Sequence, residues 1–194
     1  MLRPERLELE DFRVYGSPLG IGSYGRVCRV AHAETSDPFA MKVVPKRKLR
    51  EQSMAPYLLR EVETQKRLRH PNILILHGAF EDDEYVYILL ELAQGGSLFD
   101  VLKHRGHLSE REAAGIFTDI ASALDFLHSR GIVHRDVKPE NILMCTGDVP
   151  KLADFGWCAE LTDSSGPRKT FCGTWDYLSP EVVDNQPHDR GVDV

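Results

Sequence analysis

Eight consecutive residues carry side chains that suit phosphoryl transfer: His134-Arg135-Asp136-Val137-Lys138-Pro139-Glu140-Asn141. An Asp followed two residues later by Lys and five residues later by Asn can surround one phosphate with three functions. These are a hydroxyl-orienting carboxylate, a phosphate-binding ammonium and a metal-binding carbonyl. A polar surface turn could carry the same charges, so this hypothesis depends on other segments of the chain.

A second phosphate-binding candidate is the segment Leu19–Val27, which has the spacing G-x-G-x-x-G-x-V. Its glycines, Gly20, Gly22 and Gly25, would let backbone amides approach phosphate oxygens closely. The same spacing occurs in dinucleotide-binding units and in loose hairpins. A dinucleotide-binding unit needs a helix directly after the third glycine, whereas the residues from Arg26 to Ala33 have a strand pattern. A hairpin is therefore favoured.

One buried ion pair is predicted between a strand and a helix. Lys42 is the single charged residue in the strand Phe39–Val44, and a helix is expected from about Met54 to Arg69. On that helix Glu61 shares a side with apolar residues, so its carboxylate needs a partner once it is desolvated. Lys42 is the natural candidate, although a strand lysine is more often an exposed side chain.

The remaining pattern predicts an α+β chain of two lobes. Strands are expected over 73–80 and 85–90, and the segment 91–96 breaks the pattern as a hinge. Ser109 and Glu112 form a capping box for a helix that ends at Gly131. Its apolar stripe comprises Ala113, Ile116, Phe117, Ile120, Ala121, Leu124 and Leu127. Short strands are expected after this helix, at 132–133, 142–144 and 151–153. Earlier in the chain, the basic run 46–48 is expected in a solvated loop.

Composition narrows the function classes. The net charge is −6, which gives no basic footprint for nucleic acid. The four cysteines are far apart, so neither a disulfide framework nor a zinc site is expected. No signal segment or membrane-spanning run is seen, and we expect an intracellular protein with no membrane association.

Six motifs in this order resemble the eukaryotic protein kinase family over nearly the whole chain. They are the Gly-rich segment, Lys42, Glu61, the loop around Asp136, Asp154-Phe155-Gly156 and Ser179-Pro180-Glu181. Lys138, within the loop around Asp136, is similar to the residue that the serine/threonine branch of the family carries at that place. Finer features resemble the Aurora kinases, above all Trp157 directly after Asp154-Phe155-Gly156, and also the segments 9–12, 60–65, 68–74 and 172–178.

The resemblance implies a bilobal kinase fold: a five-stranded antiparallel N-lobe sheet with one main helix over 1–90, then a hinge and a partial, mainly helical C-lobe over 91–194. It also implies a cleft that binds ATP and Mg²⁺. Lys42, paired with Glu61, would bind the α- and β-phosphates, and Asn141 and Asp154 would bind the metal. Asp136 would orient the substrate hydroxyl and accept its proton, while Lys138 offsets charge on the phosphoryl group. The adenine ring would lie between Leu19, Val27, Ala40 and Leu143, four residues for which ordinary core packing is the alternative. Glu91 and Ala93 would hydrogen-bond it through backbone groups, and Leu90 would guard the inner pocket.

The resemblance further implies an activation segment. Thr170 would be its phosphosite, held by Arg60 and Arg135 through charge-assisted hydrogen bonds. Lys169 stands where many relatives carry a second hydroxyl residue. Glu140 would read an arginine two residues before the target Ser or Thr, with an exposed surface glutamate as the alternative.

By the family pattern, the chain stops before the last third of a kinase domain. Asp193 resembles the residue that anchors the backbone of the loop around Asp136, but we expect it to be frayed. We also expect the helix from Ser109 to expose an apolar patch, leaving the isolated chain unstable or self-associating.

Three functions follow from these expectations: an Aurora-like kinase, a nucleotide-binding module without transfer, and a non-catalytic interaction fragment. The resemblance favours the kinase. It implies mitotic protein substrates with Ser or Thr, an activating partner on the small lobe, and a nuclear or cytoplasmic location at spindle or chromosomes. Gln65, a polar residue expected to pack inward, hints at a loosely held active arrangement.

Overall fold

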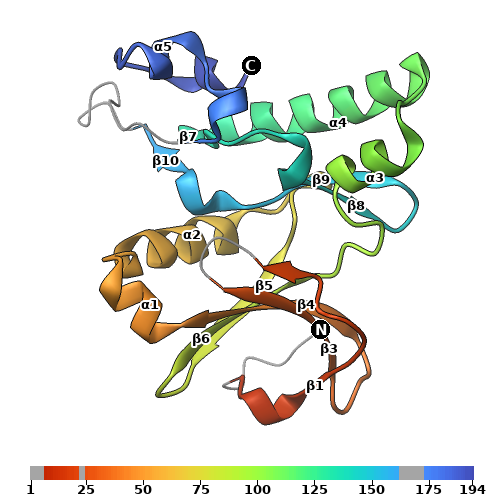
Figure 1. Cartoon of the computed structure of the whole chain (residues 1–194), viewed down its shortest axis with the longest axis vertical. Coiled ribbons are helices and arrows are strands. Elements are labelled where there is room, and N and C mark those ends of the chain that lie inside the picture. The colour runs from red at the N-terminus through yellow and green to blue at the C-terminus, as the bar shows by residue number, and fades with distance from the viewer. Residues whose placement is uncertain (1–6, 22–24, 162–172) are drawn as a thin grey trace. The chain divides into compact units, whose positions relative to one another are not determined.

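A computed structural model describes residues 7–21, 25–161 and 173–194 (Figure 1). The chain divides into two compact units. The first contains residues up to Leu68 together with Ile75–Leu92, and the second contains Arg69–Leu74 and Ala93–Val194. The segment Arg69–Leu74 belongs to the second unit because its backbone is bonded there. Leu74 N donates to Leu152 O at 2.9 Å, and Leu152 N donates to Asn72 O at 2.8 Å.

The first unit is built on one antiparallel sheet. Its strands are β1 (Phe12–Val14), β2 (Gly20–Ile21), β3 (Arg26–His32), β4 (Pro38–Pro45), β5 (Leu76–Glu81) and β6 (Tyr85–Glu91). Five of them form the path β1-β3-β4-β6-β5, and the two-residue strand β2 pairs with β3. The five-stranded sheet expected from the sequence is therefore present, with one short strand added. The 3₁₀ turn Leu9–Asp11 lies directly before β1.

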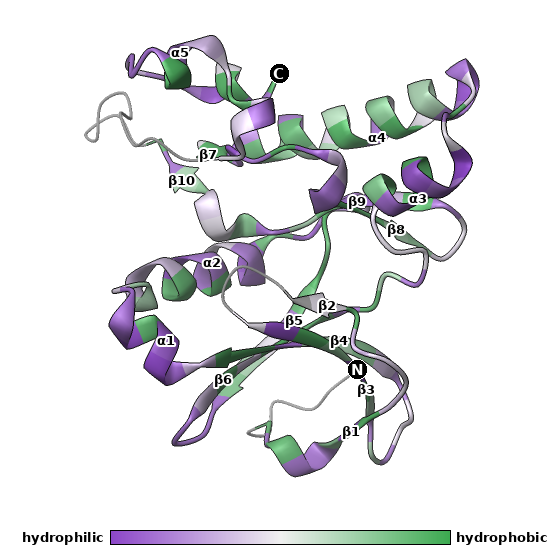
Figure 2. Cartoon of the chain, viewed as in Figure 1, coloured by the Kyte–Doolittle hydropathy of each residue, from purple (hydrophilic) through white to green (hydrophobic). Residues whose placement is uncertain are grey.

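The two faces of this sheet bury different clusters because side chains alternate along each strand. One cluster contains Phe12, Val30, Phe39, Met41, Val43, Tyr87 and Leu89. The other contains Val44, Leu49, Leu58, Leu76 and Ile88, and its members come from the sheet and from both helices of the unit. Hydrophobic residues accordingly dominate β4 and β6 in Figure 2. The face that carries Val44 and Ile88 is the one that packs against helices.

These helices are α1 (Lys46–Glu51) and α2 (Ala55–Arg67). The sequence predicted α2 but placed residues 46–48 in a solvated loop, which is wrong. Leu49 is buried and joins the core, and Arg47 Nε donates to Glu51 Oε1 at 2.7 Å across one helical turn. One buried leucine and one (i, i+4) pair are enough to favour a short helix here. Gln65 on α2 is buried, so it does pack inward.

The second unit is mainly helical. Its elements are α3 (Leu98–Arg105), α4 (Glu110–His128), β7 (Ile132–Val133), β8 (Ile142–Cys145), β9 (Val149–Leu152), β10 (Ala159–Glu160) and α5 (Pro180–Val183). β8 and β9 form an antiparallel hairpin, and β7 pairs with β10. The described residues of this unit also form the 3₁₀ turns Pro139–Asn141, Phe155–Trp157, Trp175–Tyr177 and Arg190–Asp193. No helix in the described ranges is long and apolar enough to cross a bilayer.

The capping box predicted for α4 is present. Glu112 N donates to Ser109 Oγ at 3.3 Å, and Ser109 N donates to Glu112 Oε2 at 2.9 Å. A similar box of Ser97 and Asp100 starts α3, which the sequence analysis missed.

The apolar stripe of α4 divides along its length. Ile120, Leu124 and Leu127 are buried. In contrast, Ala113 and Ala121 are exposed, and Phe117 is 76% exposed. The C-terminal half of α4 thus packs on β7 and β9, and the expected exposed apolar patch is confined to the outer side around Phe117.

Candidate active site

In the first unit, Lys42 and Glu61 form a buried ion pair. Lys42 Nζ lies 2.8 Å from Glu61 Oε1, and the two side chains are 10% and 6% exposed. β4 positions Lys42 on the helix-covered face of the sheet, and α2 carries Glu61 to it. Because neither charge could be buried alone without a large desolvation cost, the pair defines where α2 sits against β4. This is the pairing that the sequence predicted.

Several predicted adenine and phosphate residues share that sheet face with Lys42. Val27 is the register partner of both Lys42 and Gly20, and Ala40 is the partner of Leu90. Directly opposed residues lie on one face, and residues two apart along a strand do so as well. Strand pairing alone therefore gathers these residues around Lys42.

In the second unit, the catalytic candidates converge on Asp136, which is buried. Lys138 Nζ lies 2.9 Å from Asp136 Oδ2. Asn141 Nδ2 donates to Asp136 Oδ2 and to Asp136 O, both at 2.8 Å. Burial raises the pKa of the Asp136 carboxyl, but hydrogen bonds from Lys138, Thr174 and Asn141 outweigh burial and lower that pKa. Asp136 is thus held as a carboxylate with one ammonium beside it.

Thr174 is a member of this cluster whose role the sequence analysis missed. Its Oγ1 donates to Asp136 Oδ1 at 2.8 Å and accepts a hydrogen bond from Lys138 Nζ. Gly173 permits this approach, because a Cβ there would lie 2.9 Å from Arg135 O and its φ of +107° disfavours other residues. The only signal in the sequence was a hydroxyl residue after a glycine, far along the chain from Asp136.

Asp154 follows β9 in a left-handed conformation, with φ of +60°, and its Oδ1 accepts from Gly156 N at 3.4 Å. Ala153 N donates to Asn141 O at 2.8 Å, so Asp154 directly follows a residue that is bonded to the loop of Asn141. Since Asn141 donates both hydrogen bonds to Asp136 through Nδ2, its Oδ1 is the atom suited to a cation. A carboxylate and an amide oxygen are the donors that Mg²⁺ prefers.

The loop is anchored by Asp193. Asp193 Oδ2 accepts from His134 N at 2.9 Å, and Oδ1 accepts from Arg135 N at 2.6 Å. His128 Nε2 lies 2.8 Å from Asp193 Oδ2. The expectation that Asp193 is frayed is therefore wrong, because these three contacts hold its carboxylate and bury it. His134 is a fully buried packing residue, with Nε2 at 3.0 Å from Ala153 O.

The match to a family agrees with this arrangement. Residues 14–194 match the model of the protein kinase domain. The chain belongs to the protein kinase family.

The sequence of this chain is similar to those of several individual kinases. The chain is 42% identical to an Aurora kinase of Eremothecium gossypii over 98% of its length, and to Serine/threonine-protein kinase Aurora-1 of Arabidopsis thaliana over 98%. It is 37% identical to a probable myosin light chain kinase of Dictyostelium discoideum over 99%. These alignments cover 51%, 63% and 50% of the three relatives, so the chain spans about half the length of the curated kinases it matches.

The Gly-rich segment of the kinase domain is described only in part. Gly22 lies outside the described residues. A Cβ on Gly25 would lie 2.0 Å from Val43 O, whereas a Cβ on Gly20 would meet nothing within 4 Å. Gly25 is therefore required for the packing of the hairpin on β4, independently of any phosphate.

The predicted phosphosite, Thr170, also lies outside the described residues. Of its two proposed partners, Arg60 is exposed on α2, in the first unit. Arg135 Nε donates to Trp157 O at 2.8 Å, while its Nη1 is buried and has no hydrogen-bond partner among the described residues. A buried guanidinium nitrogen of this kind is suited to an anion.

The structure also describes the other residues that were predicted to contact a nucleotide. Leu19 is half-buried before β2, and Glu91 ends β6 with its N–H donating to Ile75 O at 2.9 Å. Ala93 is buried, and Leu143 is half-buried on β8. Glu140 is exposed, as a residue that reads a substrate would have to be, and as an ordinary surface glutamate would be too.

Proposed function

We propose that this chain carries the phosphotransfer machinery of an Aurora-like serine/threonine protein kinase, which transfers the γ-phosphoryl group of Mg-ATP to Ser or Thr hydroxyls of proteins. The observation that carries the proposal is the cluster of Asp136, Lys138, Asn141 and Thr174. A carboxylate with a lowered pKa can accept a hydrogen bond from a substrate hydroxyl and take its proton as the bond to phosphorus forms.

Lys138 would offset negative charge on the phosphoryl group during transfer. Its contact with Thr174 sets the ammonium at a fixed place beside Asp136, so little reorganisation is needed when the substrate arrives. Thr174 acts as a positioning residue, because its single hydroxyl holds both of the charged side chains.

Lys42 would bind the α- and β-phosphates, with Glu61 keeping the ammonium in place. Asn141 and Asp154 would hold the metal, which when bound would offset the negative charge of the phosphates. Gly20, Gly22 and Gly25 would cover the phosphates. The adenine ring would lie against Leu19, Val27, Ala40 and Leu143, with hydrogen bonds to the backbone of Glu91 and Ala93, and Leu90 would guard the inner pocket.

The finer assignments rest on the similarity to Aurora kinases. We propose that the substrates are mitotic proteins with arginine two residues before the target, read by Glu140. A phosphate on Thr170 would be gripped by Arg135 and Arg60. Location at spindle or chromosomes and an activating partner on the first unit belong to the same proposal.

The test combines binding and transfer on the purified 194-residue chain. Thermal unfolding would be followed with and without Mg-ATP, together with phosphate transfer from ATP to an Arg-containing Ser peptide. The control is Asp154→Asn, since Asn tolerates the left-handed backbone of Asp154. We expect Mg-ATP to raise the unfolding midpoint and the control to abolish transfer.

Transfer that survives in Asp154→Asn would refute the roles assigned here. A midpoint shift without transfer in the parent chain would favour the alternative of a nucleotide-binding fragment. No shift and no transfer would leave the interaction fragment as the better description of the isolated chain.

A further inference from the structure

The segment Arg69–Leu74 lies between α2 and β5 in the chain, yet its contacts place it in the second unit. It begins with a short turn, in which Ile73 N donates to His70 O at 3.2 Å. Inside this turn, Asn72 N donates to His70 Nδ1 at 3.1 Å. Asn72 is buried, so its N–H needs that ring nitrogen as an acceptor. The imidazole of His70 therefore closes the turn.

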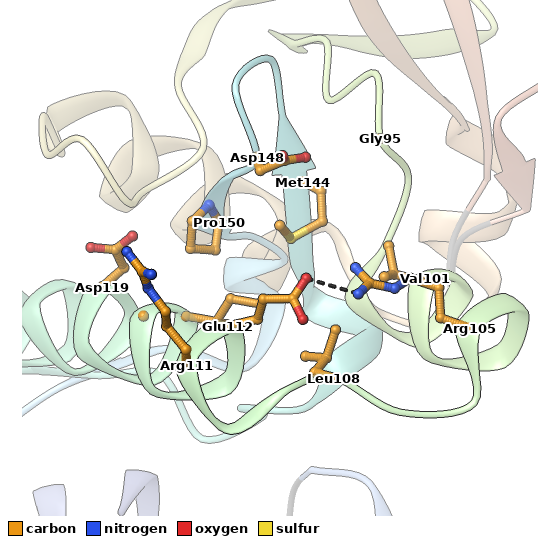
Figure 3. Close-up of a pocket in the computed structure, with 12 residues that line it drawn as sticks. Gly95, Val101, Arg105, Leu108, Arg111, Glu112, Asp119, Met144, Asp148 and Pro150 are labelled. Carbon is orange, nitrogen blue, oxygen red and sulfur yellow. Dashed lines mark hydrogen bonds and ion pairs between the residues drawn. The ribbon is translucent and has the colours of Figure 1, made fainter.

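The same turn is bonded to β9. Asn72 Nδ2 donates to Pro150 O at 3.0 Å, and the backbone bonds that join Leu152 to Asn72 and Leu74 extend along the strand. Pro150 and Asp119 both line the cavity drawn in Figure 3, which shows Asp119 on α4 and Pro150 on β9. Asn72 thus fixes the turn to a strand that packs against α4.

The ring of His70 contacts α4 as well. Its centroid lies 5.0 Å from that of the Phe126 ring, and its Nε2 lies 3.4 Å from Ser122 Oγ. The guanidinium of Arg130 lies over the same Phe126 ring, 3.6 Å from its centroid. Because a backbone N–H only donates, Nδ1 of His70 accepts, and the proton of the neutral ring is on Nε2, where the Ser122 hydroxyl can accept it. The neutral ring thus contacts one neighbour through each nitrogen.

The groups around His70 oppose a positive charge on its ring. Burial lowers the pKa of the His70 imidazole below its ordinary value of 6.5, and the Arg130 cation lowers this pKa further. Asp119 on α4 raises the pKa, and Lys151 on β9 lowers it. Protonation would also replace the acceptor at Nδ1 by a donor, which leaves the buried N–H of Asn72 without a partner. The charge of the ring and this hydrogen bond therefore change together.

We propose that His70 is an acid-sensitive latch for the segment Arg69–Leu74. With a neutral ring, the turn is closed and the segment is held against α4 and β9. With a protonated ring, the N–H of Asn72 loses its acceptor, and the segment opens locally from its first residues. Because the segment follows α2, the helix that carries Glu61, its opening would release the stretch of chain that continues from α2.

The direction of the pH effect follows from the neutral state of the folded ring. Burial and the neighbouring cations favour the neutral form, so the stability that the latch supplies is complete above about pH 6.5 and is lost as pH falls through the pKa of the folded ring. Mild acid should therefore open the latch. The proposal needs no phosphotransfer, so its failure and the failure of the function proposed above are distinguishable.

Native-state hydrogen exchange of the 194-residue chain, read by NMR, measures opening at single amides. Protection factors, which are corrected for the effect of pH on intrinsic exchange, would be compared between about pH 7.5 and about pH 5.5. Those of Asn72, Leu74 and Leu152 should fall about five- to tenfold in acid, as the loss of one hydrogen bond predicts. The protection factor of Leu89 in β6 should not change. The midpoint of the loss should equal the pKa of the His70 ring, read from its C–H proton resonances.

His70→Asn keeps the hydrogen bond and removes the titration. An Asn side chain accepts an N–H two residues further along the chain, as in an Asx turn, and it does not titrate in this range. The matched control is His107→Asn, at an exposed histidine. Protection at Asn72 should become independent of pH in His70→Asn and should fall as in the parent chain in His107→Asn. His70→Phe keeps a ring against Phe126 without the acceptor, so it should lower protection about five- to tenfold already at neutral pH.

Three outcomes would overturn the proposal. The first is protection at Asn72 that is the same at both pH values in the parent chain. The second is an equal acid-induced loss in His70→Asn. The third is a midpoint that differs from the pKa of the His70 ring by more than about one pH unit. The first and third outcomes use only the parent chain, so the proposal remains open to refutation even where a variant does not fold.

Discussion

The burial of the Lys42–Glu61 pair predicts a large asymmetry between two ion pairs of nearly equal length. Lys42 Nζ and Glu61 Oε1 are 2.8 Å apart with side chains 10% and 6% exposed. Arg47 Nε and Glu51 Oε1 are 2.7 Å apart with side chains 86% and 58% exposed. The two pairs therefore differ in burial far more than in length.

Glu61→Gln removes one charge and leaves the Lys42 ammonium buried. We expect this to cost about 3 kcal/mol, toward the low end of values for breaking buried pairs because the amide oxygen can still accept a hydrogen bond. Glu51→Gln should cost about 0.3–0.5 kcal/mol, as exposed (i, i+4) pairs do. Replacing the buried pair by Lys42→Met with Glu61→Leu should restore much of the loss, since both desolvation costs disappear.

The assay should report on the first unit alone, because unfolding of a chain with two units need not be two-state. Both tryptophans, Trp157 and Trp175, belong to the second unit, so intrinsic tryptophan fluorescence is unsuitable. Native-state hydrogen exchange of the β4 amides, read by mass spectrometry, gives a local opening free energy. If Glu61→Gln and Glu51→Gln lower it by amounts within about 0.5 kcal/mol of each other, burial is not what governs the strength of the pair.

Three further predictions concern other sites. Thr174→Val should raise the pKa of Asp136, because it removes a hydrogen bond that lowers that pKa. The acid limb of the pH profile of the phosphate-transfer rate should then move upward in pH, whereas Thr174→Ser should leave it in place. Equal pH profiles for the two variants would contradict this. Hydrogen bonds from the side chain and backbone of Ser109 and from Arg105 lower the pKa of Glu112 from 4.5 to about 2. The stability that the Glu112 carboxylate contributes is therefore complete above about pH 4.5 and is lost as pH falls toward 2. Glu112→Gln should flatten the dependence of stability on pH in that window, and an unchanged pH dependence would count against the capping contact. Gly25→Ala should destabilise the first unit by about 1–3 kcal/mol, because the added Cβ would overlap with a β4 carbonyl. The same hydrogen-exchange experiment measures this loss, and Gly20→Ala should change the opening free energy little. Comparable effects of the two substitutions would refute the packing role of Gly25.

Local patterns predicted much of this chain. A glutamate on the apolar side of a helix needed a cation, and Lys42 in a neighbouring strand supplied it. The capping box of Ser109 and Glu112 marked the start of α4 for a similar reason, since backbone donors at a helix start need acceptors. Both inferences rest on groups whose burial or geometry demands a partner within reach.

Other features were hidden because their causes lie far away in the sequence. Thr174 meets Asp136 across 38 residues, and no local rule distinguishes its hydroxyl from that of any surface threonine. Asp193 was expected to fray because of its position near the end of the chain, whereas the backbone it binds, at His134 and Arg135, holds it in place. The helix α1 was obscured by its density of charge, which masked the single buried Leu49.

The anchoring of the loop around Asp136 by Asp193 has a consequence for the order of events during biosynthesis. The contact joins residues 58 apart, so the loop around Asp136 cannot be held in its final form until that later aspartate has been made. At roughly 5–20 residues per second, the ribosome adds that length in about 3–12 s. During this interval the nascent chain would carry Asp136, Lys138 and Asn141 without the carboxylate that fixes the backbone of their loop.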